Sequence, residues 1–150
     1  MTYKTMSRQE AIKRTFKRSR LPKGFYLDNS YIIDCNMIGL FTDHKIKKGD
    51  FIGEYLGKVL TPYEANNTKS KYMFDVKEGR KPVFVLDGKN KRFSSFIRYV
   101  NAANTFSQQN TEFKQFDKRI FLRAIKNIRS NSELLTWYGV NTNDIIKEEY

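Results

Sequence analysis

Tyrosine is the catalytic side chain that this sequence offers most clearly, because histidine and cysteine each occur only once. The single histidine, His44, lies in a Thr-Asp-His-Lys turn with no nucleophile beside it, which excludes a serine or cysteine triad. The single cysteine, Cys35, excludes a disulfide framework and a multi-cysteine zinc site, and it is interpreted as a packed thiol. Gly39, Gly53 and Gly57 lack the Lys-Ser/Thr pair that completes a phosphate-binding loop. No metal site is therefore expected.

Three segments resemble, in the correct order, motifs of the SET-domain lysine methyltransferases. Residues 37–41 (Met-Ile-Gly-Leu-Phe) and 51–59 (Phe-Ile-Gly-Glu-Tyr-Leu-Gly-Lys-Val) are similar to the family's G-x-G-(V/L)-F and E-Y-x-G-E strands. Residues 98–101 (Arg-Tyr-Val-Asn) are similar to its R-F-I-N-H-S loop. Residues 133–139 (Glu-Leu-Leu-Thr-Trp-Tyr-Gly) are similar to its closing E-L-x-x-x-Y-G. The last two segments most closely resemble the PR/SET branch, and the resemblance covers about residues 20–140.

The resemblance implies a mainly β fold, the SET-domain β-clip of short strands, with small helices and a knot-like threading of the C-terminal part. It also implies S-adenosyl-L-methionine as the cofactor. The residues expected to bind it are Met37, Ile38, Gly39, Tyr72, Asn101 and Ala102. A glycine permits close approach to a ligand, and the Asn101 amide can both donate and accept at the cofactor's amino-acid end.

The substrate lysine is expected to enter from the opposite face, through a channel lined by Tyr55 and Thr136, and to meet the methyl group beside Tyr138, the expected catalytic residue. Lysine must lose a proton to act as a nucleophile, although its ordinary pKa is about 10.4. An apolar channel next to the cofactor's sulfonium disfavours the ammonium form, so no side-chain base is required. The small Thr136 leaves room for higher methylation states.

Two departures from the family pattern keep other functions open. Met37 replaces the first glycine of G-x-G, and Leu122 stands where some PR/SET enzymes have a second tyrosine. The leading hypothesis is a protein-lysine N-methyltransferase that acts on a histone tail. The alternative is a catalytically weak PR-type module that binds chromatin or a partner protein. A third hypothesis is a nucleic-acid-binding domain that uses the SET-like strands as a scaffold.

The elements that must position these residues are short. A basic helix is expected over Arg8–Ser19, a second short helix starts at Thr61, and Ser95–Val100 forms a short helix or turn. Alternating apolar residues between turn signals indicate strands. The expected strands are Tyr31–Asp34, Gly39–Thr42, Phe51–Leu60, Tyr72–Val76, Val83–Asp87, Thr111–Phe116, Arg119–Ile125 and Leu134–Tyr138.

Positive charge is concentrated at the N-terminus. The chain has 28 Lys and Arg against 16 Asp and Glu, a net charge of +12, and residues 1–24 hold eight of these cations against one Glu. The sequence therefore predicts a basic arm (1–22), a SET domain (23–140) and a polar tail (141–150). The arm is expected to contact DNA or to direct nuclear import. The arm residues concerned are Lys13, Arg14, Lys17, Arg18 and Arg20.

The composition excludes two broad classes of protein. Hydrophobic residues make up 39% of the chain, too many for a disordered chain, and no apolar run is long enough to span a membrane. A nuclear or chromatin-associated protein in a reducing, intracellular compartment is expected, with a histone or another protein as its substrate. The sequence leaves the oligomeric state open.

Overall fold

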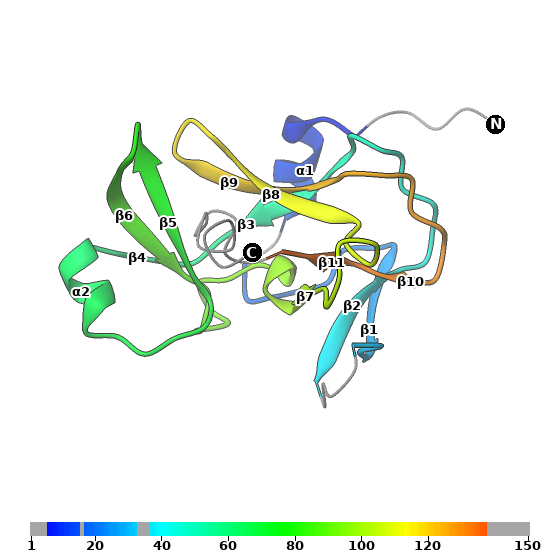
Figure 1. The fold of residues 1–150 in the computed structure, drawn as a ribbon, viewed down its shortest axis with the longest axis horizontal. Coiled ribbons are helices and arrows are strands. Elements are labelled where there is room, and N and C mark those ends of the chain that lie inside the picture. The colour runs from blue at the N-terminus through cyan, green and yellow to red at the C-terminus, as the bar shows by residue number, and fades with distance from the viewer. Residues whose placement is uncertain (1–5, 16, 33–36, 138–150) are drawn as a thin grey trace.

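The computed structural model describes residues 6–15, 17–32 and 37–137. Within them, short strands form four small sheets linked by loops and three short helices (Figure 1), and the predicted mainly β SET fold is confirmed. None of these helices is long and apolar enough to cross a lipid bilayer. Cys35, Tyr138 and the tail 141–150 lie outside the described residues.

The bounds of the elements follow the chain. The helices are α1 (Arg8–Arg14), α2 (Pro62–Asn66) and the 3-10 helix η1 (Phe96–Tyr99). The first strands are β1 (Phe25–Asn29), β2 (Ile38–Thr42), β3 (Phe51–Tyr55), β4 (Lys58–Leu60), β5 (Met73–Glu78) and β6 (Lys81–Asp87). The later strands are β7 (Asn101–Ala102), β8 (Thr111–Phe116), β9 (Arg119–Ala124), β10 (Ser132–Glu133) and β11 (Leu135–Thr136).

The four sheets have the strand orders β1-β2-β10, β3-β9-β8, β4-β6-β5 and β7-β11. Among the described strands, only β7 and β11 pair in parallel, with Asn101 beside Leu135 and Ala102 beside Thr136. This pairing brings the end of the described chain to the loop that follows η1 (Figure 1). It agrees with the position that the family resemblance implied for the C-terminal motif.

Helix α1 is shorter than predicted, and the expected bounds Arg8–Ser19 were wrong. The helix ends at Arg14 because the next residue, Thr15, has extended backbone angles. The Thr15 hydroxyl donates to the carbonyl of Ala11 at 2.7 Å and accepts the N–H of Glu54 at 2.9 Å. The Ala11 side chain is buried. A tertiary hydrogen bond to β3 thus ends the helix and attaches it to the domain.

The expected strand Tyr31–Asp34 was also wrong, because neither Tyr31 nor Ile32 belongs to a strand. The first strand is β1, whose ladder with β2 ends where the Ser30 N–H donates to the Met37 carbonyl at 2.9 Å. The next N–H, that of Tyr31, turns away and donates to the carboxylate of Glu133 at 2.7 Å. A buried acceptor on β10 therefore ends the strand.

Of two other expected strands, one is divided in the structure and the described part of the other is shortened. The segment Phe51–Leu60 forms β3 and β4, which belong to different sheets. The described part of Leu134–Tyr138 forms only β11, because the Leu134 N–H donates to the Leu40 carbonyl at 2.8 Å while the next residue pairs with β7. The strands β5, β6, β8 and β9 were predicted correctly, with small shifts at their ends, and they pair as the hairpins β5–β6 and β8–β9.

Gly57 lies between β3 and β4, where the backbone passes closest to β6. A Cβ at Gly57 would lie 2.6–2.8 Å from backbone atoms of Asp87, which are held in the ladders with β4 and β5. Replacing Gly57 with alanine is therefore expected to lower the free energy of unfolding by about 2–3 kcal/mol, measured by denaturant titration. Gly79→Asn, at an open position with φ +65°, is the control and should change it by less than about 1 kcal/mol. Equal stability of the two variants would contradict the prediction.

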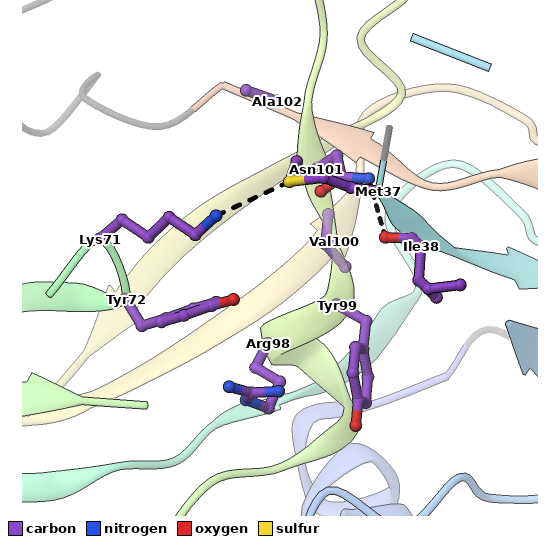
Figure 2. Close-up of a pocket in the computed structure, with 9 residues that line it drawn as sticks. All are labelled: Met37, Ile38, Lys71, Tyr72, Arg98, Tyr99, Val100, Asn101 and Ala102. Carbon is purple, nitrogen blue, oxygen red and sulfur yellow. Dashed lines mark hydrogen bonds between the residues drawn. The ribbon is translucent and has the colours of Figure 1, made fainter. Parts of the chain in front are cut away.

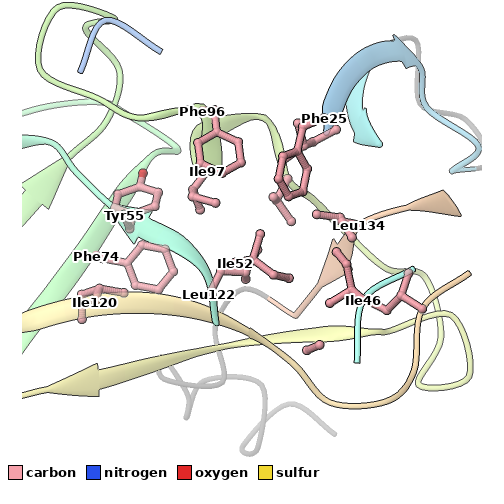
Figure 3. Packing of buried hydrophobic residues seen from close by; sticks show 14 of the residues in the cluster. Phe25, Ile46, Ile52, Tyr55, Phe74, Phe96, Ile97, Ile120, Leu122 and Leu134 are labelled. Atoms are coloured by element: carbon pink, nitrogen blue, oxygen red, sulfur yellow. The ribbon is translucent and has the colours of Figure 1, made fainter. Parts of the chain in front are cut away.

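Buried apolar side chains from most elements form one core (Figure 3). Helix η1 packs on β3 so closely that a Cβ at Gly53 would lie 2.8 Å from side-chain atoms of both Phe96 and Ile97. Both of these η1 side chains are fully buried. The core therefore fixes η1, which includes Arg98 and Tyr99, and with it the direction of the residues from Val100 to Ala102 that follow.

Candidate functional site

A pocket of about 540 Å³ lies where three segments meet: the start of β2, the residues just before β5, and η1 with β7 (Figure 2). Sites for cofactors and other small molecules usually have volumes of roughly 300–1,000 Å³. The pocket is therefore large enough for a cofactor, and its walls come from parts of the chain that are distant in sequence.

Five of the six predicted cofactor-binding residues line this pocket. They are Met37, Ile38, Tyr72, Asn101 and Ala102. The sixth residue, Gly39, lies directly behind the wall, since a Cβ there would be 3.4 Å from Nδ2 of Asn101. The structure thus brings together residues that the sequence connected only through a family resemblance.

The Asn101 side chain joins two walls of the pocket. Its Nδ2 donates to the backbone carbonyl of Ile38 at 3.1 Å (Figure 2) and to Oε2 of Glu133 at 3.3 Å. The Asn101 backbone pairs with Leu135 of β11. The side-chain amide therefore holds β2 against β7, and it supports the shape of the pocket in addition to any contact with a ligand.

Glu133 opens the closing motif 133–139, but the sequence analysis assigned it no role in the site. Its side chain is buried, and its carboxylate accepts the Ser30 hydroxyl at 2.7 Å, the Tyr31 N–H at 2.7 Å and the Asn101 amide at 3.3 Å. It therefore connects the loop after β1 with the pocket wall. Its signal in the sequence was a carboxylate at the start of an otherwise apolar closing motif.

Tyr72 is held from both sides. Its ring faces the guanidinium of Arg98, whose carbon lies 4.6 Å from the ring centroid. Arg98 in turn donates to the backbone carbonyls of Gly88 and Lys89, each at 3.0 Å. The Tyr72 carbonyl accepts the N–H of Gly88 at 3.0 Å and the hydroxyl of Tyr55. Tyr72 thus has a fixed position although it precedes β5.

Two cations in the pocket wall, Lys71 and Arg98, were also absent from the predicted site. Nζ of Lys71 lies 3.6 Å from the sulfur of Met37, which links the segment before β5 with the start of β2 (Figure 2). Lys71 precedes the predicted site residue Tyr72, and Arg98 belongs to the motif 98–101. A motif, however, does not show in which direction a side chain points. Together they make this wall of the pocket positively charged.

The two residues predicted for the substrate channel, Tyr55 and Thr136, do not line this pocket. Tyr55 is in the core, with its ring centroid 4.8 Å from that of Phe74. Thr136 is fully buried, and its hydroxyl donates to the Thr111 carbonyl at 3.4 Å. The predicted catalytic residue, Tyr138, lies outside the described residues. The roles assigned to these three residues stay predictions.

The basic arm lies against the domain, and its cations differ in exposure. Arg14 points inward: its Nη1 donates to the Ile52 carbonyl at 3.3 Å and its guanidinium carbon lies 5.1 Å from the ring centroid of Phe25. Burial lowers the pKa of Arg14, against the opposing effects of Asp50 and Glu10. The other four cations predicted for nucleic-acid contact are exposed, namely Lys13, Lys17, Arg18 and Arg20.

The family is established by comparison with known domains. The family model of the PR domain of PR domain zinc finger protein 2 matches residues 25–149. The chain belongs to the PR domain family. Its match begins just after the basic arm and includes every segment that lines the pocket.

Named relatives and solved structures agree with this assignment. The PR domain is 30% identical to histone-lysine N-methyltransferase set-17 of Caenorhabditis elegans, over 97% of this chain and 52% of that protein. It is 36% identical to human histone-lysine N-methyltransferase PRDM7, over 79% and 24%. The structure of the methyltransferase domain of human PR domain-containing protein 2 superposes with a TM-score of 0.67 at 25% identity, over 91% and 90%.

The PR domain chain is shorter than the curated relatives that it matches. It spans about half of the length of set-17 and about a quarter of PRDM7. The names of these relatives therefore place the chain in a family that includes methyltransferases.

Proposed function

We propose that this PR domain is an S-adenosyl-L-methionine-dependent protein-lysine N-methyltransferase that acts on a histone-tail lysine. One observation carries the proposal: five residues predicted from the family motifs converge on a single pocket of about 540 Å³. The relatives named histone-lysine N-methyltransferases support the same activity.

The side chains of the pocket fit the proposed cofactor. Lys71 and Arg98 supply positive charge for the carboxylate of its amino-acid end. The rings of Tyr72 and Tyr99 offer flat apolar surfaces, and the Ala102 backbone offers polar groups for the adenine. When bound, the cofactor supplies a methyl group on a positively charged sulfur to a neutral lysine amine.

The remaining chemistry is to present that amine without its proton. Apolar walls disfavour an ammonium group, which lowers the pKa of the entering lysine. Tyr55 and Thr136 are the residues proposed for these walls. The Tyr138 hydroxyl is proposed to orient the amine and to stabilise the charge that develops during transfer. Positioning then supplies most of the acceleration, without a histidine or a carboxylate pair.

Cofactor binding and methyl transfer test this proposal. The chain is titrated calorimetrically with S-adenosyl-L-methionine and incubated with core histones and radiolabelled cofactor. Replacing Asn101 with alanine should weaken cofactor binding about tenfold or more, since Ile38 and Glu133 lose a shared hydrogen-bond donor. Asn104→Ala, exposed in the same loop, is the control and should bind like the wild type. A wild-type chain that neither binds the cofactor nor transfers the methyl group contradicts the proposal.

One contact favours a second function, a PR-type module that binds chromatin or a partner protein with weak or no catalysis. It involves Met37, which replaces the first glycine of the family's G-x-G strand. The Met37 side chain is part of the pocket wall, with Nζ of Lys71 at 3.6 Å from its sulfur. The same experiment separates the two functions. Cofactor binding with methyl transfer supports the enzyme, whereas failure of both supports the binding module.

DNA contact through the exposed arm cations and a chromatin-associated location belong to the same proposal. Deleting the arm is a poor test, because Ala11 is buried and the Ser19 hydroxyl shares a buried hydrogen bond with that of Ser94 at 2.8 Å. Single substitutions such as Lys13→Gln, which leave these contacts intact, are therefore the appropriate variants.

A further inference from the structure

A second basic surface lies at the end of the molecule where the loops 43–50 and 125–131 run side by side (Figure 1). The loops are joined by an antiparallel bridge in which Ile46 and Ile128 exchange backbone hydrogen bonds of 3.0 and 2.8 Å. Both isoleucine side chains are buried. Because side chains alternate along extended backbone, their neighbours point outward.

Five exposed or half-exposed cations belong to this surface, which we call the basic bridge. They are Lys45, Lys47, Lys48, Lys126 and Arg129. Continuing the register of the bridge places Lys45 directly opposite Arg129, an arrangement that costs stability because like charges repel. Within residues 6–15, 17–32 and 37–137, no acidic side chain forms an ion pair with either of them.

The acidic residues of these loops are engaged elsewhere. Asp50 is buried, and its carboxylate accepts the N–H groups of Met6 at 2.8 Å and Lys47 at 3.1 Å. Asp43 lies 3.1 Å from Nδ1 of His44. The positive charge of the basic bridge is therefore not neutralised by its own loops, and it faces solvent.

The backbone beneath these cations is fixed. The Lys48 N–H donates to Oδ1 of Asn127 at 2.9 Å, and the Gly49 N–H donates to the Ala124 carbonyl at 2.9 Å. The Met6 carbonyl accepts the N–H of Phe51 at 2.9 Å, so the segment leading into α1 adjoins the same loops. A polyanion would therefore meet cations on a rigid base, and its binding would not have to order the backbone of these loops.

We propose that the basic bridge binds the phosphate backbone of duplex DNA, independently of its sequence. The loops 43–50 and 125–131 themselves contain no Phe, Tyr or Trp on which the bases of a single strand could stack. Its apolar side chains are buried or half-buried, so it lacks the exposed anchors that protein interfaces require. Lys126 donates to the Ser107 carbonyl at 2.8 Å, and none of the five cations forms an ion pair with another described residue. Clustered cations of this kind are what phosphate contacts use. The inference does not depend on methyl transfer.

The test is fluorescence anisotropy of the 150-residue chain with a labelled, mixed-sequence duplex of about 20 base pairs, over a series of salt concentrations. The variant is Lys45→Gln with Arg129→Gln. Binding should weaken about tenfold or more at low salt, and the slope of log K against log salt should become shallower by about 1.8, or 0.9 for each lost phosphate contact. Thermal stability should be equal to or above that of the wild type, because the like-charge pair is gone.

The control removes the same charge from the opposite end of the molecule. Arg80→Gln with Lys81→Gln alters exposed residues at the β5–β6 turn and should leave the salt slope unchanged (Figure 1). An equal loss of affinity in the control would overturn the proposal, as would unchanged binding by the bridge variant. Tighter binding of a single-stranded RNA of the same length would also overturn it.

Discussion

Replacing Glu133 with alanine is expected to lower the free energy of unfolding by about 3 kcal/mol and to weaken cofactor binding at the same time. Glu133 is 4% exposed, and its carboxylate accepts hydrogen bonds from Ser30, Tyr31 and Asn101. Alanine leaves these donors without their acceptor, and hydrogen bonds to a charged group contribute about 1.5–3 kcal/mol each. Because Asn101 also holds Ile38, the damage reaches the pocket wall.

A double-mutant cycle with Gly39→Ala makes this prediction specific. A Cβ at Gly39 would overlap the Glu133 carboxylate, which three hydrogen bonds keep from moving aside. Gly39→Ala should therefore be costly in the wild type and much less costly once Glu133 is alanine. Denaturant unfolding and calorimetric cofactor titration of all four proteins measure the coupling. Additive effects, or a loss below about 1 kcal/mol for Glu133→Ala, would show that the carboxylate does not organise the pocket.

Removing the hydroxyl of Tyr138 is expected to slow methyl transfer about a hundredfold and to leave cofactor affinity within about twofold. On the proposed function, this hydroxyl acts on charge that appears only during transfer, and removing one such donor usually costs 10²–10³ in rate, about 3–4 kcal/mol. Single-turnover transfer to a histone peptide, beside calorimetric titration with cofactor, measures the two effects separately for Tyr138→Phe.

Tyr26→Phe is the matched control for this experiment. It deletes the same hydroxyl from β1, where the group donates to Oδ1 of Asn131 at 3.2 Å on the surface. The control should transfer methyl groups at the wild-type rate. Undiminished transfer by Tyr138→Phe contradicts the catalytic role. Loss of cofactor binding in that variant would instead assign Tyr138 to the structure of the pocket.

The part of the site that the sequence predicts well consists of residues inside recognisable motifs. Asn101 and Met37 were found because their neighbours match family patterns, and both residues line the same pocket. Lys71 was missed, and Glu133 was quoted in a motif without a role, for the same physical reason. Their contribution depends on where a long side chain points once three segments are assembled, and neither spacing nor residue type encodes that direction.

The same distinction explains which elements were predicted correctly. The hairpin β8–β9 follows from alternation and a local turn, so its limits are readable in the sequence. Helix α1 and the strand expected at Tyr31–Asp34 failed where a distant partner decides the outcome. Thr15 leaves the helix to bond with Glu54, and Tyr31 leaves the ladder to bond with Glu133. In both cases a tertiary hydrogen bond overrides the local propensity.

The parallel pairing of β11 with β7 has a consequence for the newly made protein. The β7 wall of the pocket is held by Leu135 and Glu133, which are synthesised after every residue that lines it. A chain emerging from the ribosome can form its hairpins early, because their partners are adjacent, whereas this closure must wait for the synthesis of β11. Premature termination a few codons before Glu133 would therefore leave most of the described strands present and remove the residues that hold the β7 wall of the pocket.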